Sequence, residues 1–407
     1  MAVTAFPELY ARTFDERIAA LVPEAAARVA FFASRLRAAG LEPRAIGDVA
    51  ALDRLPVLSK DQLVDLQAAQ PPFGGLLADG AKIRRVFQSP GPLYEPEPAL
   101  PDPWRVAPAL DCAGFGADDV VLNAASYHLS PLGAMFEQGI FALGGTVVPA
   151  GVGNIELQAR CCRDLGVTAY VGLPSYLKAL LERAEETGLD PASWALERAF
   201  VAAEPLPPSL RVWLEQRVST VRQGYGTAEA GILGYECDVR DGLHVPSEAL
   251  VQVCDLSTGK ALWDGSEGEV VVTVLSSDYP MIRLGTGDLS AFLIEPCPCG
   301  RPTPRLAGWL GRVGEAVKVR GMFLHPRQAQ AAVGGVTGVA SFRLLIDRVA
   351  HRDVLHCEVV PADAVDGASL AAVVKERIRS GLRFDADVVL VDSIGEGPLI
   401  VDRRTWE

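Results

Sequence analysis

Apolar runs alternate with amphipathic stretches through the middle of the chain. Short apolar runs, which predict buried strands, lie at residues 120–125, 146–150, 167–172 and 199–203. Helical spacing of apolar residues covers residues 132–143, 155–165, 175–186 and 208–217. A strand followed by a helix, repeated at this spacing, is typical of a parallel sheet covered on both faces. Ligands bind such sheets at the loops that leave the strand ends.

The two ends of the chain follow other patterns. Residues 1–80 carry helical spacing, and Ser59 is placed to cap a helix. After about Gly234, β-prone runs separated by turn residues predict a small β subdomain. A strand–helix–strand pattern begins at about Arg312. Its expected helices cover residues 326–333 and 368–380.

These patterns predict an α/β protein of at least two domains, because 407 residues exceed what one core usually holds. We expect a large N-terminal domain at residues 1–311, built from parallel sheets with helices and including a β subdomain at about residues 235–311. A small α+β C-terminal domain is expected at residues 312–407.

Composition and charge narrow the class of protein. Hydrophobic residues make up 49% and charged residues 22% of the chain, which is typical of a folded globular protein. The net charge is -13 and no Lys/Arg-rich run is present, so nucleic acid and anionic membranes are not expected partners. Acidic residues interrupt the N-terminus where a signal peptide would be apolar, and we expect a cytoplasmic protein. A bound nucleotide would therefore need local donors.

The first candidate site is the glycine-rich segment RQGYGTAEAG at residues 222–231. Glycines at a strand exit let the backbone approach a phosphate. Thr227 offers a donor to a phosphate, Glu229 a ligand for Mg²⁺, and Tyr225 a ring to stack on a base. For this segment alone, a tight turn with a buried tyrosine carries equal weight.

Two later segments also offer candidate residues for binding a nucleotide. In PMIRLGTGDL (residues 280–289), Asp288 follows a Gly-Thr-Gly turn, where a carboxylate can accept both ribose hydroxyls. An Asp that caps a turn is the alternative. The segment GRVGEAVKVRG at residues 311–321 places Arg312, Lys318 and Arg320 near the expected domain boundary. Three such segments in this order are far more specific than any one.

Together the three segments resemble the adenylate-forming superfamily of acyl-CoA ligases, and more closely its phenylacetate-CoA ligase branch. The resemblance runs over nearly the whole chain and includes LPVLSKDQL at residues 55–63 and AAEP at residues 202–205. It implies the adenylate-forming fold with a small, mobile C-terminal domain. It also implies that a carboxylate reacts with ATP to give an acyl-adenylate, from which a CoA thiol then takes the acyl group.

The resemblance assigns roles to individual residues. Thr227 and Glu229 are the catalytic candidates, at the α-phosphate and Mg²⁺. Adenine and ribose would be held by a cofactor-binding set consisting of Glu204, Tyr225, Gly226, Asp288, Arg312 and Lys318. Tyr127 and His128 lie where relatives shape the acyl pocket, although a lone histidine at a helix start is more often structural.

Two segments depart from the family pattern. The phosphate loop of relatives is rich in Ser, Thr and Gly, whereas residues 88–97 contain prolines, which lack N–H donors, with Glu95 and Glu97 adding negative charge. The terminal lysine of relatives is also absent, and Arg403 or Arg404 would have to replace it.

The hinge position differs as well. Gly314, with Glu315 beside it, stands where relatives usually carry an acid.

A further motif predicts a metal. Cys237, His244, Cys297 and Cys299 match a structural Cys₃His zinc site, and a C-x-C pair can supply two sulfurs from one turn. By resemblance, some relatives carry a metal at matching positions. Buried thiols in a turn beside a surface histidine are the alternative.

Two functions follow from these observations. The retained Thr227, Glu229, Asp288 and Arg312 favour a ligase that activates an aryl or arylacetic carboxylate with ATP and transfers it to CoA or a carrier thiol. The altered loop and missing lysine favour a family member that binds a nucleotide, acyl-CoA or acyl-adenylate without ATP-driven activation. A homodimer is expected from the resemblance only.

Overall fold

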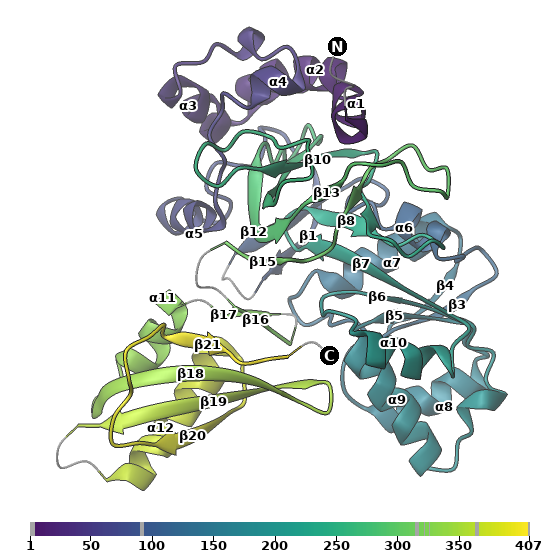
Figure 1. Cartoon of the computed structure of the whole chain (residues 1–407), viewed down its shortest axis with the longest axis vertical. Helices are drawn as coiled ribbons and strands as arrows, with labels where there is room; N and C mark the ends of the chain where they lie inside the picture. The colour runs from purple at the N-terminus through teal and green to yellow at the C-terminus, as the bar shows by residue number, and fades with distance from the viewer. Residues whose placement is uncertain are drawn as a thin grey trace. The chain divides into compact units, whose positions relative to one another are not determined.

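A computed structural model describes residues 5–89, 93–313, 317–320, 322–324, 326–362 and 366–405. The chain divides into two compact units (Figure 1). Unit 1 comprises Met1–Leu206 and Arg211–Gly311, and unit 2 comprises Pro207–Leu210 and Arg312–Glu407. Within the described ranges, every helix is too short or too polar to cross a membrane.

The centre of unit 1 is a nine-stranded sheet in the order β13-β14-β9-β8-β7-β6-β5-β3-β4. Its parallel part consists of β3 (Val120–Asn123), β4 (Thr146–Val148), β5 (Ala169–Gly172), β6 (Arg198–Val201) and β7 (Thr220–Thr227). The helices between these strands are α7 (Leu132–Ala142), α8 (Ile155–Asp164), α9 (Pro174–Glu186) and α10 (Pro208–Glu215). The predicted strand–helix alternation and α/β class are therefore confirmed.

Beyond β7 the sheet becomes antiparallel, because the chain turns back directly after the glycine-rich segment. The antiparallel strands are β8 (Gly231–Tyr235), β9 (Leu243–His244), β13 (Phe292–Leu293) and β14 (Arg305–Leu306). Short elements α6 (Ala107–Cys112) and η2 (Pro191–Ser193) complete this part of unit 1.

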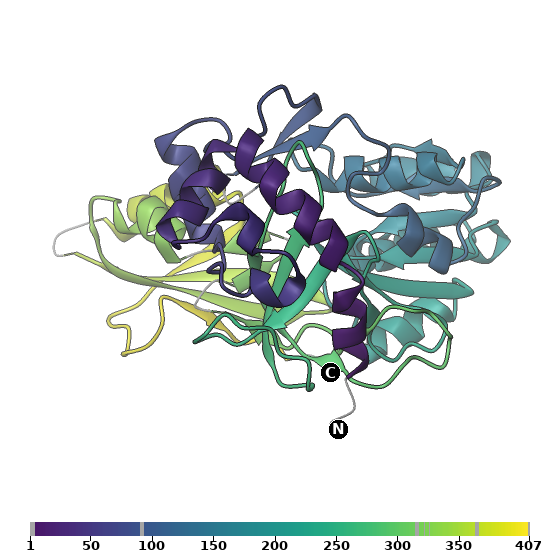
Figure 2. The same cartoon turned by 90° about the horizontal axis from the view of Figure 1, so that it is seen from above.

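A second sheet has the order β10-β11-β12-β15, formed by β10 (Ala249–Cys254), β11 (Gly268–Val274), β12 (Leu284–Ser290) and β15 (Gly311–Arg312). The N-terminal helices share one apolar core with β10–β12, and Figure 2 shows them lying over these green strands. These helical elements are α1 (Phe6–Arg12), α2 (Asp15–Arg28), α3 (Ala30–Ala38), η1 (Pro43–Ala45), α4 (Val49–Leu52) and α5 (Lys60–Ala69). Ser59 caps α5, in a reciprocal capping box with Gln62.

The segment at residues 88–97, expected to be a loop, lies mostly in a β-hairpin. Strands β1 (Ile83–Gln88) and β2 (Tyr94–Pro98) pair antiparallel, with Phe87 opposite Glu95 and Arg85 opposite Glu97. Residues 90–92 of the turn lie outside the described residues. Prolines in β2 concealed the strand in the sequence, but a two-stranded hairpin leaves each strand with an edge at which proline is tolerated.

Unit 2 is an α+β fold with its own core, which includes Leu344, Val359, Leu370 and Ile378. Its sheet has the order β20-β19-β18-β21, formed by β18 (Val339–Val349), β19 (Arg352–Pro361), β20 (Ala386–Leu390) and β21 (Ile400–Asp402). The other elements are the hairpin β16 (Val317–Val319) and β17 (Met322–Leu324), α11 (Pro326–Ala329) with π-helical η3 (Gln330–Gly334), and α12 (Gly367–Arg377) with π-helical η4 (Ile378–Leu382).

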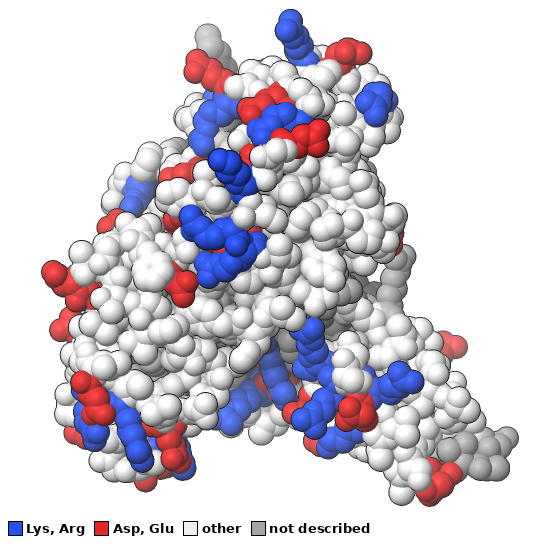
Figure 3. Space-filling model, turned by 180° about the vertical axis from the view of Figure 1, so that it is seen from behind, with Lys and Arg blue, Asp and Glu red and all other residues white. Residues whose placement is uncertain are grey.

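Charged side chains of both signs intermix on the face shown in Figure 3. Many of the exposed ones pair locally, such as Arg12 with Glu8 at 2.7 Å and Arg183 with Glu186 at 2.9 Å. Exposed pairs contribute little to stability. The polar interactions that matter most energetically are therefore the buried ones, which occur in both units.

Candidate functional site

The glycine-rich segment forms the end of β7 and the turn into β8. A Cβ atom on Gly224 would lie 2.4 Å from the Phe200 ring, and one on Gly226 would lie 2.5 Å from the Gly231 carbonyl oxygen. Close packing within the sheet therefore already requires both glycines. In the turn, the Ala230 N–H donates to Thr227 Oγ1 at 3.2 Å. This places Thr227 and Glu229 at the carboxyl edge of the parallel strands.

The first group of polar side chains at this edge, the Asp288 cluster, comprises Tyr225, Thr286, Asp288 and Trp309. The Tyr225 hydroxyl donates to Asp288 Oδ2 at 2.9 Å and lies 3.2 Å from Thr286 Oγ1. The Trp309 indole N–H donates to Asp288 Oδ1 at 3.0 Å. Asp288 is only 4% exposed. The structure thus brings the predicted Tyr225 and Asp288 together and adds Trp309, which sequence reasoning missed.

The second group, the Lys60 cluster, comprises Lys60, Glu95, Glu229 and Glu269. Lys60 Nζ lies 3.0 Å from Glu229 Oε2, and their side chains are 12% and 6% exposed. Backbone hydrogen bonds position Lys60: the Leu58 N–H donates to the Arg283 carbonyl, and the Gly285 N–H to the Leu58 carbonyl. Lys60 was also missed. It lies in the segment LPVLSKDQL that carries the resemblance, but the sequence shows it only as the first residue after a helix cap, 169 positions from Glu229.

The acids of the Lys60 cluster differ in their pKa values. Burial raises the pKa of Glu229, but the Lys60 ammonium and several hydrogen bonds outweigh it, so the net pKa lies below its ordinary value. Burial raises the pKa of Glu95 well above its ordinary value; nearby Glu229 adds to this and Lys60 opposes it. Burial also raises the pKa of Glu269, against a hydrogen bond from the Gly287 N–H. Lys60 is thus the cation beside three acids.

Glu97 does not carry the uncompensated charge that its sequence position indicated. Its fully buried side chain accepts two hydrogen bonds from the Arg85 guanidinium, one of them at 3.1 Å. Arg84 lies 3.7 Å from the same carboxylate. Arginines of β1 therefore balance Glu97 within the hairpin, because cross-strand pairing places Arg85 opposite it.

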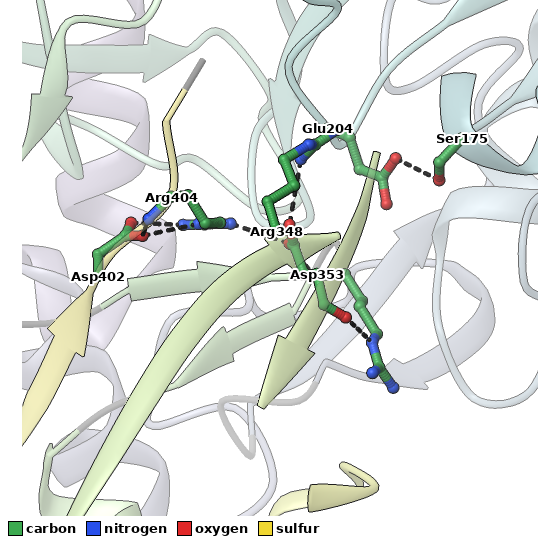
Figure 4. Close-up of polar contacts among 7 residues, drawn as sticks. Ser175, Glu204, Arg348, Asp353, Asp402 and Arg404 are labelled. Carbon is green, nitrogen blue, oxygen red and sulfur yellow. Dashed lines mark hydrogen bonds and ion pairs between the residues drawn. The ribbon is translucent and has the colours of Figure 1, made fainter. Parts of the chain in front are cut away.

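The other predicted site residues take varied positions. Ser175 donates to Glu204 at 2.6 Å, as Figure 4 shows, and Arg312 is half-buried on β15.

The residues predicted to border the acyl group differ in exposure. Tyr127 is half-buried, and its hydroxyl accepts from Asn123 Nδ2 at 2.7 Å and donates to Glu137 Oε2 at 3.2 Å, whereas His128 is exposed. The backbone of Lys318 lies in β16, but its side chain, like Gly314 and Glu315, lies outside what the structure describes.

Of the arginines considered as replacements for the terminal lysine, Arg404 is bound within unit 2. Its guanidinium contacts Asp353 at 2.9 Å and Asp402 at 2.6 Å, and Arg348 joins Asp353 at 3.1 Å (Figure 4). A guanidinium held by two carboxylates is poorly placed to move toward a substrate. Arg403 lies next to it, with its backbone N–H bonded to the Ile346 carbonyl.

The predicted metal ligands converge in unit 1. The ligand atoms of Cys237, His244, Cys297 and Cys299 all lie within 4.8 Å of one another. The Cys237 and Cys297 sulfurs are 3.7 Å apart, and Cys299 Sγ lies 3.3 Å from His244 Nε2. Tetrahedral zinc with Zn–S bonds of about 2.3 Å implies sulfur–sulfur separations of about 3.7 Å. His244 Nδ1 lies 2.9 Å from the Thr303 carbonyl oxygen, which assigns the proton to Nδ1 and leaves Nε2 as the ligand atom.

Known proteins share sequence and fold with this chain. The family model for AMP-binding enzymes matches residues 102–274. Phenylacetate-coenzyme A ligase of Thermus thermophilus is 30% identical over 354 residues, covering 82% of this chain and 77% of that protein. The Aromatoleum evansii phenylacetate-coenzyme A ligase is 29% identical, over 96% and 94%.

A solved structure extends the match to the fold. The crystal structure of 2-hydroxyisobutyryl-CoA ligase in complex with 2-HIB-AMP and CoA superimposes with a TM-score of 0.89 and 25% identity, covering 98% of this chain and 90% of that one. The chain therefore belongs to the AMP-binding, adenylate-forming family that includes the phenylacetate-coenzyme A ligases.

Proposed function

We propose that the protein is a ligase that activates an aryl or arylacetic carboxylate with ATP and transfers the acyl group to CoA or another thiol. A carboxylate oxygen attacks the α-phosphorus and pyrophosphate leaves; the thiol then attacks the acyl carbon and AMP leaves. The observation that carries the proposal is the 2.9 Å hydrogen bond between Tyr225 and Asp288, with Thr227 and Glu229 on the same strand end as Tyr225.

In this proposal, each part of the nucleotide has its own residues. Asp288 and Arg312 hold the ribose, Thr227 donates to the α-phosphate, and the adenine lies beside the loop and strand that carry Glu204, Tyr225 and Gly226. Glu229 would hold Mg²⁺, which neutralises charge on the phosphates when bound. Lys318, on the small and mobile C-terminal unit, would add a cation, and Tyr127 and His128 would border the acyl group. Catalysis then rests on positioning and charge stabilisation.

The test is acid-dependent exchange of pyrophosphate into ATP. With Mg²⁺ and a panel of aryl and arylacetic acids, at least one acid is expected to support exchange, and Asp288→Ala should reduce it strongly. A complete absence of exchange across the panel, in protein that is folded, contradicts the proposal.

A second function is favoured by the Lys60 cluster. An ammonium already balances Glu229, and the sequence that follows β1 contains Pro90 and Pro92, which offer no N–H donors to a phosphate. These features suit a protein that binds AMP or an acyl-adenylate without activating ATP. Calorimetry with AMP, Mg²⁺-ATP and CoA separates the two functions: tight AMP with weak ATP supports the second, and tight Mg²⁺-ATP supports the first.

We also propose that Cys237, His244, Cys297 and Cys299 bind a structural Zn²⁺. Three thiolates and a neutral imidazole in a closed set of four are typical of structural zinc. The purified protein should contain about one zinc per chain, and Cys297→Ser should lose most of it. The matched control is Cys161→Ser, a partly exposed cysteine outside the cluster. A metal content well below one, unchanged by Cys297→Ser, contradicts the site.

A further inference from the structure

We propose that Trp309 is a positioning residue of the nucleotide site, whose indole N–H fixes the Asp288 carboxylate in the orientation that accepts a ribose diol. The inference rests on the proposed nucleotide function and deepens it. Trp309 lies 21 positions after Asp288 and belongs to none of the motifs that the sequence offered.

The geometry around Asp288 supports this role. Donors from two separate segments hold its two oxygens: Tyr225 on β7 binds Oδ2 at 2.9 Å, and Trp309, in the stretch before β15, binds Oδ1 at 3.0 Å. A carboxylate held on both oxygens cannot rotate about its Cβ–Cγ bond without breaking one of the two hydrogen bonds. The plane of the carboxylate is therefore fixed before a ligand arrives.

The position of Trp309 is itself set by β12. On one side, the Ser290 hydroxyl donates to the Gly308 carbonyl at 2.7 Å. On the other side, the Leu310 N–H donates to the Leu289 carbonyl at 3.0 Å. Both partners in β12 directly follow Asp288, so the strand that carries the carboxylate also holds the indole that orients it.

Asp288 and Trp309 differ in burial. Asp288 is 4% exposed, but Trp309 is 39% exposed despite its large apolar ring. Part of the Trp309 side chain thus stays accessible while its N–H is directed to the carboxylate. The 2′ and 3′ hydroxyls of a ribose are a rigid pair, so they bind best to an acceptor whose orientation is already fixed.

The test compares AMP with 2′,3′-dideoxy-AMP, which lacks both hydroxyls, by calorimetry on the full chain. Wild-type protein should prefer AMP. Trp309→Phe should weaken AMP binding about tenfold, because a hydrogen bond to a charged group is lost, and should leave dideoxy-AMP binding unchanged. The control is Trp263→Phe, which removes an indole stacked on Phe292 at 5.7 Å and should change neither affinity.

The outcomes separate the two proposals. If the wild type binds no adenine nucleotide, the proposed function fails and Trp309 loses its role with it. If the wild type binds AMP, but Trp309→Phe binds it equally well, more tightly, or with the same preference over dideoxy-AMP, only the role of Trp309 is overturned.

A second measurement covers the case in which Trp309→Phe does not fold. AMP should change the tryptophan fluorescence of the Trp263→Phe protein, because Trp309 is retained there beside the ribose. No change in that fluorescence at saturating AMP overturns the role of Trp309.

Discussion

The Asp288 cluster and the Lys60 cluster hold buried carboxylates in different ways. Asp288 accepts hydrogen bonds from a phenol and an indole, whereas Glu229 is paired with an ammonium and lies near a second acid, Glu95. A ribose hydroxyl resembles the neutral donors that already surround Asp288. A metal ion or a phosphate that reaches Glu229 must instead disturb a buried ion pair. If Asp288 and Glu229 hold the nucleotide as proposed, this difference predicts that a nucleoside is accommodated more readily than the outer phosphates of ATP.

The largest expected loss of stability comes from removing the Lys60 ammonium. Lys60→Met leaves the Glu229 charge buried without its counter-ion, and the free energy of unfolding should fall by about 3–5 kcal/mol. Urea unfolding monitored by circular dichroism measures it. The double variant Lys60→Met/Glu229→Gln should recover most of the loss, since the charge that Lys60 contacts directly is removed with it. A loss below about 1 kcal/mol in the single variant would show that the ion pair is weak and would remove the contrast between the clusters.

A smaller loss of unfolding free energy is expected when the neutral donor Tyr225 is changed. Tyr225→Phe removes one hydrogen bond to the Asp288 carboxylate and should cost about 1.5–3 kcal/mol of unfolding free energy, measured in the same way. The control is Tyr176→Phe, whose hydroxyl lies 3.0 Å from the carbonyl of Gly153 near the surface, with an expected cost below about 1 kcal/mol. Equal losses in the two variants would mean that Asp288 is not held more strongly than a surface carbonyl.

The last effect, and the smallest over any single pH unit, is the pH dependence of the Lys60 cluster. The raised pKa of Glu95 means that the folded protein keeps a proton that the unfolded chain loses, so this group lowers stability as pH rises from its ordinary pKa through the folded one. Glu229, with its lowered pKa, acts oppositely: its contribution is present above its ordinary pKa and is lost as pH falls through the folded one.

Unfolding free energies between pH 4 and 8 test this assignment. In the wild type, Glu95 should make the free energy of unfolding decline with rising pH by at most about 1.4 kcal/mol per pH unit, the limit for one proton. Glu95→Gln should remove this decline. Identical pH profiles for the wild type and Glu95→Gln would place Glu95 in an ordinary, ionised state.

The sequence predicted best what is encoded locally. Residues 120–217 repeat a strand and a helix within short windows, so periodicity located β3–β6 and α7–α10 to within a few residues. The hairpin β1–β2 was missed because Pro96 and Pro98 hide its strand character. Lys60 and Trp309 were missed because their roles depend on contacts across the fold, such as the one that Lys60 makes with Glu229. Only the packing of α5 and the path of the chain before β15 create those contacts.

The pairing of Leu58 with Leu284 limits how many N-terminal residues can be removed without loss of the fold. Leu58 gives and receives a backbone hydrogen bond at the start of β12, four residues before Asp288. A shortened form beginning after α5 would expose an unsatisfied strand edge at that point and would uncover the apolar side of β10–β12. Such fragments should aggregate rather than fold. The first sixty residues are thus part of the scaffold that carries the candidate site, and deletion mapping of function has to start elsewhere.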